Sequence, residues 1–128
     1  MSTSIICLKE AKVYQKDHLV LQKVNIDLVH GEFIYLIGKT GSGKSSLLKT
    51  LYGDLPLQQG IGEVAGYDLS KLKEKDIPYL RREIGIVFQD FQLLTDRSVK
   101  DNLSFVLVAT GWSDKDKIKT RILEVLEQ

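Results

Sequence analysis

The order of apolar and polar residues changes several times along the chain, and each pattern predicts a different element. A strand is predicted from Ile5 to Val13, where most side chains are apolar. Residues 23–28 then alternate strictly between polar and apolar side chains, and the apolar members are Val24, Ile26 and Leu28. Because successive strand residues point to opposite faces, this period of two predicts a half-buried strand.

Two runs are apolar almost throughout, Phe33–Ile37 and Ile84–Phe88. Short continuous apolar stretches are typical of strands that are buried on both faces, as in parallel sheets. We therefore expect the two runs to be parallel neighbours in one sheet. A turn at His30–Glu32 precedes the first run, and Gly60–Tyr67 carries a further short strand.

Other segments have the spacing of helices. Residues 46–52 are predicted to form a helix that is stopped by Gly53, because glycine commonly follows a helix C-terminus. Asp76 is the expected N-cap of a second helix, with Pro78 in its first turn. The sequence therefore predicts a short helix from Tyr79 to Glu83.

Two further helices are predicted beyond the second apolar run. The first spans Val99–Ala109. Ser113, with Asp116 three residues later, is the expected capping box of the second. The apolar residues of this last helix share one face: Ile118, Ile122, Val125 and Leu126.

Composition limits the classes of function. The 128 residues carry a net charge of +1, so we expect no nucleic-acid partner and no direct binding to a membrane surface. Cys7 is the only cysteine, which excludes an intrachain disulfide and fits a reducing cytoplasmic location. The histidines, His18 and His30, form no metal-binding cluster, and no segment is long and apolar enough to cross a bilayer. Any membrane role must come through a partner.

The first apolar run leads directly into a glycine-rich loop. Residues 38–45 read Gly-Lys-Thr-Gly-Ser-Gly-Lys-Ser, which matches the phosphate-binding pattern G-x-x-x-x-G-K-[ST] in full. Glycines let the backbone fold into a concavity whose N–H groups face a phosphate, and the following helix adds its positive N-terminus. Such a pattern can arise by chance, but the flanking strand and helix patterns favour a site for a nucleoside triphosphate.

The residue types in the loop have distinct expected roles. Lys44 supplies a positive charge to the β- and γ-phosphates, and Ser45 supplies a hydroxyl ligand for the Mg²⁺ that bridges them. Ser46 can add a further donor. The expected binding residues of the loop are Gly38, Lys39, Thr40, Gly41, Ser42, Gly43, Lys44, Ser45 and Ser46.

The sequence resembles the ATP-binding subunit of ATP-binding-cassette (ABC) systems. The resemblance is carried by Tyr14, His30–Glu32, Gly38–Ser46 and Gly85–Asp90, and it spans nearly the entire chain. Within that family, Asp96–Asn102 is most similar to the bacterial cell-division member, the FtsE type. Lipoprotein-releasing and macrolide-exporting members share much of this pattern.

The resemblance implies roles for three residues outside the loop. Tyr14 would stack on adenine, although an aromatic residue on a strand can also be an ordinary core residue. Val20 would pack beside the base. Gln89 would be catalytic together with Lys44, because its amide oxygen would reach Mg²⁺ and the attacking water. The alternative for Gln89 is an ordinary glutamine at a strand end.

The resemblance also implies partners. Such proteins hydrolyse ATP as a dimer of two nucleotide-binding domains and bind an integral membrane subunit, which is of the FtsX type in the cell-division members. Phe91, Leu93 and Leu94 follow Gln89 on a segment that faces the membrane subunit in such proteins, although these residues are equally suited to a core. With ATP and Mg²⁺ as ligands, the implied location is the cytoplasmic face of the cell membrane, where the partner would hold the protein.

The implied fold is the α/β fold of P-loop NTPases in incomplete form. Residues 1–90 would contain an antiparallel β subdomain, the phosphate loop and the first parallel strands, and residues 91–128 would begin the helical subdomain. The apolar stripe of the last helix runs up to Gln128 without a stop signal, which we interpret as a cut. The family's signature motif, acidic strand, catalytic glutamate and switch histidine would lie beyond it. We therefore expect ATP binding without efficient turnover.

Two alternatives come from other classes. Residues 87–90 could be the acidic strand of a small, complete P-loop kinase or GTPase, in which Asp90 would hold Mg²⁺ through water. Against this, residues 91–128 are helical in pattern, and Arg81–Arg82 is better explained as a solvated helix face. The chain could instead be a self-associating interaction module without turnover, because unpaired strand edges favour domain swapping.

Overall fold

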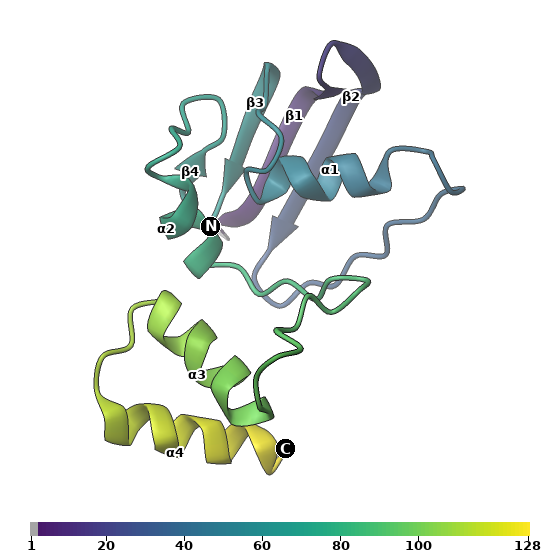
Figure 1. The fold of residues 1–128 in the computed structure, drawn as a ribbon. Helices are drawn as coiled ribbons and strands as arrows, with labels where there is room; N and C mark the ends of the chain where they lie inside the picture. Colours follow the sequence, from purple (N-terminus) through teal and green to yellow (C-terminus); the bar gives the residue numbers. More distant parts are fainter. Residues whose placement is uncertain (1–2) are drawn as a thin grey trace. The chain divides into compact units, whose positions relative to one another are not determined.

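A four-stranded antiparallel sheet forms the centre of the first part of the chain (Figure 1). In the computed structural model, which describes residues 3–128, β1 (Ser4–Gln15) and β2 (His18–Val29) form a long hairpin. β3 (Gln59–Val64) pairs with the other edge of β1, and the short β4 (Tyr67–Asp68) pairs with β3. The sheet order is therefore β2-β1-β3-β4.

Both predicted strands of the long hairpin are confirmed. The strand expected at Ile5–Val13 lies within β1, and residues 23–28 of β2 alternate between exposed polar and half-buried apolar side chains. The segment predicted as one strand over Gly60–Tyr67 is instead a tight hairpin. There β3 ends at Val64, which pairs directly with the first residue of β4.

Helix α1 (Lys44–Leu51) packs on one face of the sheet (Figure 1), where its buried Leu47 joins the core. The helix is followed by Gly53, with a φ of 77°, as the sequence predicts. Helix α2 (Ile77–Arg82) adds the fully buried Leu80 to the same core. The buried members of this core are Leu8, Ala11, Val13, Leu47, Leu57, Val64, Leu69 and Leu80.

Helix α2 lacks the side-chain cap that was predicted for it. Asp76 occupies the N-cap position, but its carboxylate accepts a hydrogen bond from the backbone N–H of Lys73, at 3.3 Å, and none from the helix. The reason is conformational, because Asp76 has helical backbone angles (φ −90°, ψ −21°), whereas a capping residue is normally extended. Pro78 lies in the first turn as predicted.

The two apolar runs do not form the predicted parallel strands. Neither residues 33–37 nor residues 84–88 pair with any strand in the described part of the chain. The side chains of residues 33–37 are open to solvent, with exposed fractions of 79% for Phe33 and 89% for Ile37. In the second run Val87 is 90% exposed, whereas Ile84, Ile86 and Phe88 are half-buried. A parallel strand that is buried on both faces needs hydrogen-bonded neighbours and covering helices, and neither run has a neighbouring strand here.

The second part of the chain is a separate unit built on two helices, α3 (Val99–Ala109) and α4 (Lys115–Leu126). The first unit ends at Gly85. The division at residue 90 that the resemblance implies stays a prediction. Helix α3 has the bounds that were predicted. The two helices pack on each other, and the buried residues of α4 are Ile118 and Ile122. None of the described helices has the length and apolar character needed to cross a membrane.

Helix α4 begins one residue later than its predicted cap implies. Asp114, not Ser113, is the N-cap, and its carboxylate accepts hydrogen bonds from the backbone N–H groups of Asp116 (2.9 Å) and Lys117 (3.1 Å). The predicted capping box at Ser113 is therefore wrong. Both residue types are good N-caps, so adjacent candidates compete and the sequence pattern does not decide between them.

Candidate nucleotide-binding site

The glycine-rich loop ends at the N-terminus of α1, which has no side-chain cap. Gly43 is the N-cap residue, with a φ of 101°, and the first turn contains no acidic residue. By contrast, α3 and α4 are capped by Ser98 and Asp114 and carry an acidic residue in the first turn. Like the shorter α2, α1 lacks a side-chain acceptor for its first N–H groups, but α1 differs from α2 in having a glycine at the N-cap. This is the arrangement in which a helix N-terminus binds an anion.

Gly43 is also packed tightly against β2. A Cβ atom at this position would lie 2.7 Å from Cγ1 of Val20 and 2.9 Å from Cγ of Leu21, which is too close for an ordinary contact. The positive φ adds a second reason for glycine, because side chains rarely adopt that conformation. The contact fixes the end of the loop on the β1–β2 hairpin.

Lys44 joins the two ends of the loop. Its ammonium donates hydrogen bonds to the backbone carbonyls of Gly38 and Lys39, the latter at 2.8 Å, and lies 3.4 Å from Oγ of Ser42. The backbone N–H of Ser42 donates to the carbonyl of Lys39 at 3.0 Å. These bonds close the loop and hold the Lys44 charge beside its backbone.

The loop is open to solvent along most of its length. Residues 38–42 and Ser45 are exposed, and Gly43, Lys44 and Ser46 are half-buried. The loop therefore offers an ammonium, several hydroxyls and uncapped helix amides, which suit phosphate oxygens. The exposed Ser45 hydroxyl is an oxygen ligand of the kind that Mg²⁺ uses beside phosphates. No group of three His, Cys, Asp or Glu residues within residues 3–128 is placed to hold a metal.

The structure brings Tyr14 and Val20 to the end of the hairpin that contacts the loop. Tyr14 is half-buried on β1 and pairs with Leu19 of β2. The next residue, Val20, is the one whose side chain approaches Gly43. The residue expected to stack on adenine thus lies on the strand pair that supports the phosphate loop.

Gln89 belongs to the second unit, where it is exposed in a turn. Phe91 and Gln92 follow it with φ angles of 58° and 48°, which non-glycine residues seldom adopt. Phe91 and Leu93 are 70% and 65% exposed, whereas Leu94 is half-buried. The proposed approach of Gln89 to the phosphate loop stays a prediction.

Asn102 has a structural role that the sequence patterns did not reveal. Its side-chain oxygen accepts a hydrogen bond from the N–H of Leu94 at 2.8 Å, and its nitrogen donates to the carbonyl of Leu94 at 3.0 Å. The same nitrogen donates to the carbonyls of Arg97 and Ser98. One amide group on α3 therefore holds the segment that follows Gln89. The sequence offers one signal for this role, because asparagine has a low helix propensity and yet lies inside a predicted helix. Such a residue is expected to make a contact outside its own helix.

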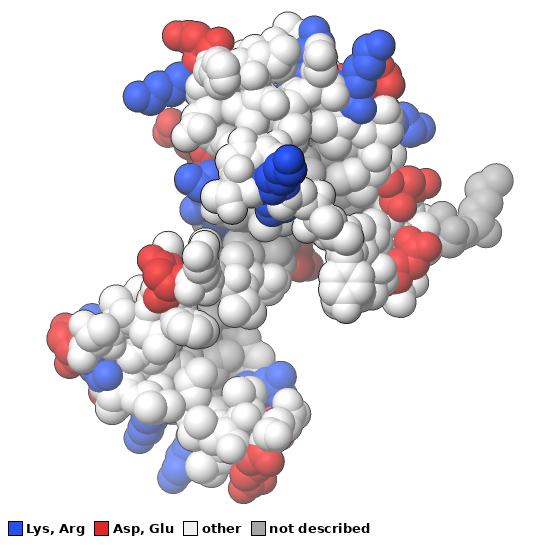
Figure 2. Space-filling model, turned by 90° about the vertical axis from the view of Figure 1, so that its right-hand side faces the viewer, with Lys and Arg blue, Asp and Glu red and all other residues white. Residues whose placement is uncertain are grey.

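Acidic and basic side chains are interspersed on the face shown in Figure 2.

One surface carboxyl group has a shifted pKa. The side-chain hydroxyl of Ser70 and the ammonium of Lys71 lower the pKa of Asp68, and the backbone N–H of Ser70 adds to the effect.

The chain is similar to bacterial cell-division proteins. It is 38% identical over 125 residues to the cell division ATP-binding protein FtsE of Streptococcus pneumoniae (serotype 2, strain D39), and 39% identical over 124 residues to that of Bacillus subtilis (strain 168). The matches cover 97% and 96% of this chain, and 54% of each relative. The chain therefore spans about half the length of the curated relatives it matches.

Solved structures of ATP-binding cassettes have the same fold. A dimeric cassette in a post-hydrolysis state, bound to ADP and phosphate, matches with a TM-score of 0.81 and 26% identity, over 95% of this chain and 56% of that chain. The cbiO1 protein of Clostridium perfringens, part of the ABC transporter complex cbiONQ, matches with a TM-score of 0.83 and 30% identity. That match covers 97% of this chain and 49% of the other. The predicted fold class, an incomplete α/β P-loop fold with an antiparallel sheet, is confirmed.

The family model described as ABC transporter matches residues 21–128. This range includes the glycine-rich loop, α1 and both helices of the second unit. The family match decides against the alternative of a small, complete P-loop kinase or GTPase. The chain therefore belongs to the ABC transporter family, and within it the chain is similar to FtsE proteins.

Proposed function

We propose that residues 38–46 bind the triphosphate of ATP together with Mg²⁺. The observation that supports this most strongly is the N-terminus of α1, which has a glycine N-cap, no side-chain acceptor and the Lys44 ammonium beside it. A triphosphate provides the anionic acceptors that a glycine cap omits. In α3 and α4 the first backbone N–H groups donate to the N-cap side chains, Ser98 and Asp114. In α1 these N–H groups have no such acceptor and can donate to a phosphate instead.

The residues of the proposed site contribute different interactions. Lys44 offers its charge to the β- and γ-phosphates while it keeps the loop closed, and Ser45 is an oxygen ligand for Mg²⁺. Ser46 adds a hydroxyl donor. Tyr14 stacks on the adenine, with Val20 beside it. When bound, Mg·ATP supplies a phosphoanhydride bond whose phosphate charge is partly neutralised by the metal.

For the whole protein we infer ATP hydrolysis that is coupled to a membrane partner in cell division. Support comes from the FtsE relatives and from the dimeric cassette solved in a post-hydrolysis state. In this proposal two copies of the domain form the hydrolytic dimer, and Gln89 acts as a catalytic residue that contacts Mg²⁺ and orients the attacking water. The partner is an FtsX-type subunit that holds the protein at the inner face of the cell membrane. A lipoprotein-releasing or macrolide-type transporter is the alternative within the family.

Removal of the Lys44 charge tests the nucleotide site. We expect titration calorimetry to detect saturable Mg·ATP binding to the wild type and affinity at least about tenfold lower in Lys44→Ala, because hydrogen bonds to charged groups contribute about 1.5–3 kcal/mol. Lys49→Ala removes the same charge from the other end of α1 and is the matched control. Its affinity should stay within about twofold of the wild type, since surface charges there contribute little. Equal losses in both variants, or no binding by folded wild type, would contradict the proposal.

A second candidate, self-association through the exposed apolar run, is favoured by residues 33–37. Phe33, Tyr35 and Ile37 are all at least 79% exposed, and the run has no strand partner in the described structure. An unpaired, apolar, β-prone segment is a ready template for a strand from a second copy. Size-exclusion chromatography with light scattering tests this. A dimer that Tyr35→Lys converts to monomer supports it, and a wild-type monomer at high concentration contradicts it.

A further inference from the structure

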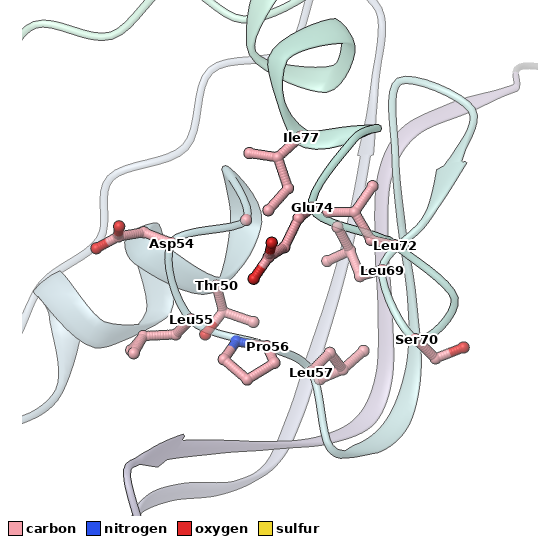
Figure 3. Close-up of a pocket in the computed structure, with 11 residues that line it drawn as sticks. Thr50, Asp54, Leu55, Pro56, Leu57, Leu69, Ser70, Leu72, Glu74 and Ile77 are labelled. Carbon is pink, nitrogen blue, oxygen red and sulfur yellow. The ribbon is translucent and has the colours of Figure 1, made fainter.

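A cavity of about 310 Å³ lies in the first unit, at the opposite end of α1 from the phosphate loop (Figure 3). It is lined by the buried Thr50 near the end of α1 and by the core residues Leu57 and Leu69. Leu72 and Ile77 complete much of the apolar lining. The volume is at the lower end of the range of small-molecule sites, about 300–1,000 Å³. The cavity can therefore hold a compact ligand.

One carboxylate points into this cavity. In Figure 3 the side chain of Glu74 extends toward the middle of the lining residues, whereas the carboxylate of Asp54 points away from them. Asp54 forms an ion pair with Arg81, at 3.7 Å. Glu74 forms no hydrogen bond or ion pair with any residue of the described chain, 3–128. Its charge is thus available to a ligand.

The surroundings of the cavity favour a positive ligand. The lining contains two carboxylates and no lysine, arginine or histidine. Lys73 and Lys75 flank Glu74 in sequence but do not line the cavity. An anion would meet the Glu74 carboxylate, with no cationic side chain in the lining to offset it.

We propose that this cavity binds a small organic cation, namely a primary ammonium group on a compact apolar body. The ammonium pairs with the Glu74 carboxylate, and the body covers the leucine and isoleucine side chains, whose apolar surface is then removed from water. The cavity shares no residue with the phosphate loop. The proposal therefore does not depend on nucleotide binding, although α1 connects the two places.

Phenethylammonium is a suitable probe, because it joins a primary ammonium to one compact apolar ring. We expect saturable binding to the 128-residue protein in an NMR titration, with amide shifts that include Thr50, Leu69 and Leu72. The matched anion, 3-phenylpropionate, should give no saturable shifts at these amides. Glu74→Gln keeps the shape of the side chain and removes its charge, and it should weaken phenethylammonium binding by about tenfold. Asp54→Asn is the control, because that carboxylate points away from the cavity and should leave affinity within about twofold.

Three results would overturn the proposal: equal binding of cation and anion, unchanged affinity in Glu74→Gln, or no saturable binding to folded wild type. Because Glu74 is exposed, its replacement by glutamine should leave the fold intact, which circular dichroism checks. The comparison of cation with anion uses the wild-type protein alone. It decides the question even if a variant is poorly folded.

Discussion

Replacement of Gly43 by alanine tests how the phosphate loop is held on the β1–β2 hairpin. The new methyl group would lie 2.7 Å from Val20 and 2.9 Å from Leu21, so the hairpin or the loop must move. It would also occupy a residue with a φ of 101°. Gly41→Ala is a matched control, since Gly41 has a φ of 80° but no atom within 4 Å of a Cβ at that position.

The two variants separate backbone strain from steric overlap. A left-handed conformation costs a non-glycine residue about 1–2 kcal/mol, and both variants carry this cost. Overpacking adds about 1–3 kcal/mol, and only the alanine at position 43 carries it. We therefore expect Gly43→Ala to lower the free energy of unfolding by about 2–5 kcal/mol, and Gly41→Ala by about 1–2 kcal/mol. The larger loss is a substantial part of the 5–15 kcal/mol that is typical of a domain.

Urea denaturation followed by circular dichroism measures both changes. The slope of unfolding free energy against urea should stay constant, so that the midpoints report stability alone. If the two variants differ by less than about 0.5 kcal/mol, the contact of Gly43 with Val20 and Leu21 does not restrain the loop. The account of the loop's support would then be refuted.

Three other tests use point substitutions in separate parts of the structure. Asn102→Ala should cost about 1–3 kcal/mol, because it leaves the backbone of Leu94 without its partners, and hydrogen exchange at the Leu94 amide should become faster. Asp114→Ala should cost about 1 kcal/mol through loss of a helix cap, whereas Ser113→Ala should change unfolding free energy by less than about 0.5 kcal/mol. Tyr14→Ala should weaken ATP and GTP binding alike, because stacking tolerates different bases.

Each of these tests has a clear opposite result. Unchanged exchange at Leu94 would show that the Asn102 amide does not hold the segment. A larger effect at Ser113 than at Asp114 would restore the predicted capping box. A loss of ATP binding alone, with GTP binding intact, would mean that Tyr14 acts through something other than stacking.

The elements that the sequence predicts well depend on local signals. The alternation over residues 23–28 predicts a half-buried strand because one face of the hairpin contacts the core. The pattern of residues 38–45 predicts the loop because its glycines and its lysine have fixed positions relative to the following helix. Helix α3 was predicted at its observed bounds, and its Ser98 cap lies just before it.

The features that the sequence did not predict depend on residues distant in the chain. Phe33–Ile37 has the composition of a buried strand, but a strand forms only when another strand supplies its hydrogen bonds. The fit of Gly43 against Val20 and Leu21 joins segments that no local pattern connects. The hydrogen bonds of Asn102 to Leu94 likewise become visible only after the loop has folded back on α3.

The most direct test of the phosphate site is to observe its own amides. In ¹⁵N-labelled protein titrated with Mg·ATP, we expect the largest backbone amide shifts at residues 41–46, with smaller shifts at Tyr14 and Val20. The same titration of Lys44→Ala should show little change at these amides. Shifts concentrated elsewhere in the chain, with residues 41–46 unaffected at saturation, would contradict the claim that this loop and the start of α1 hold the triphosphate.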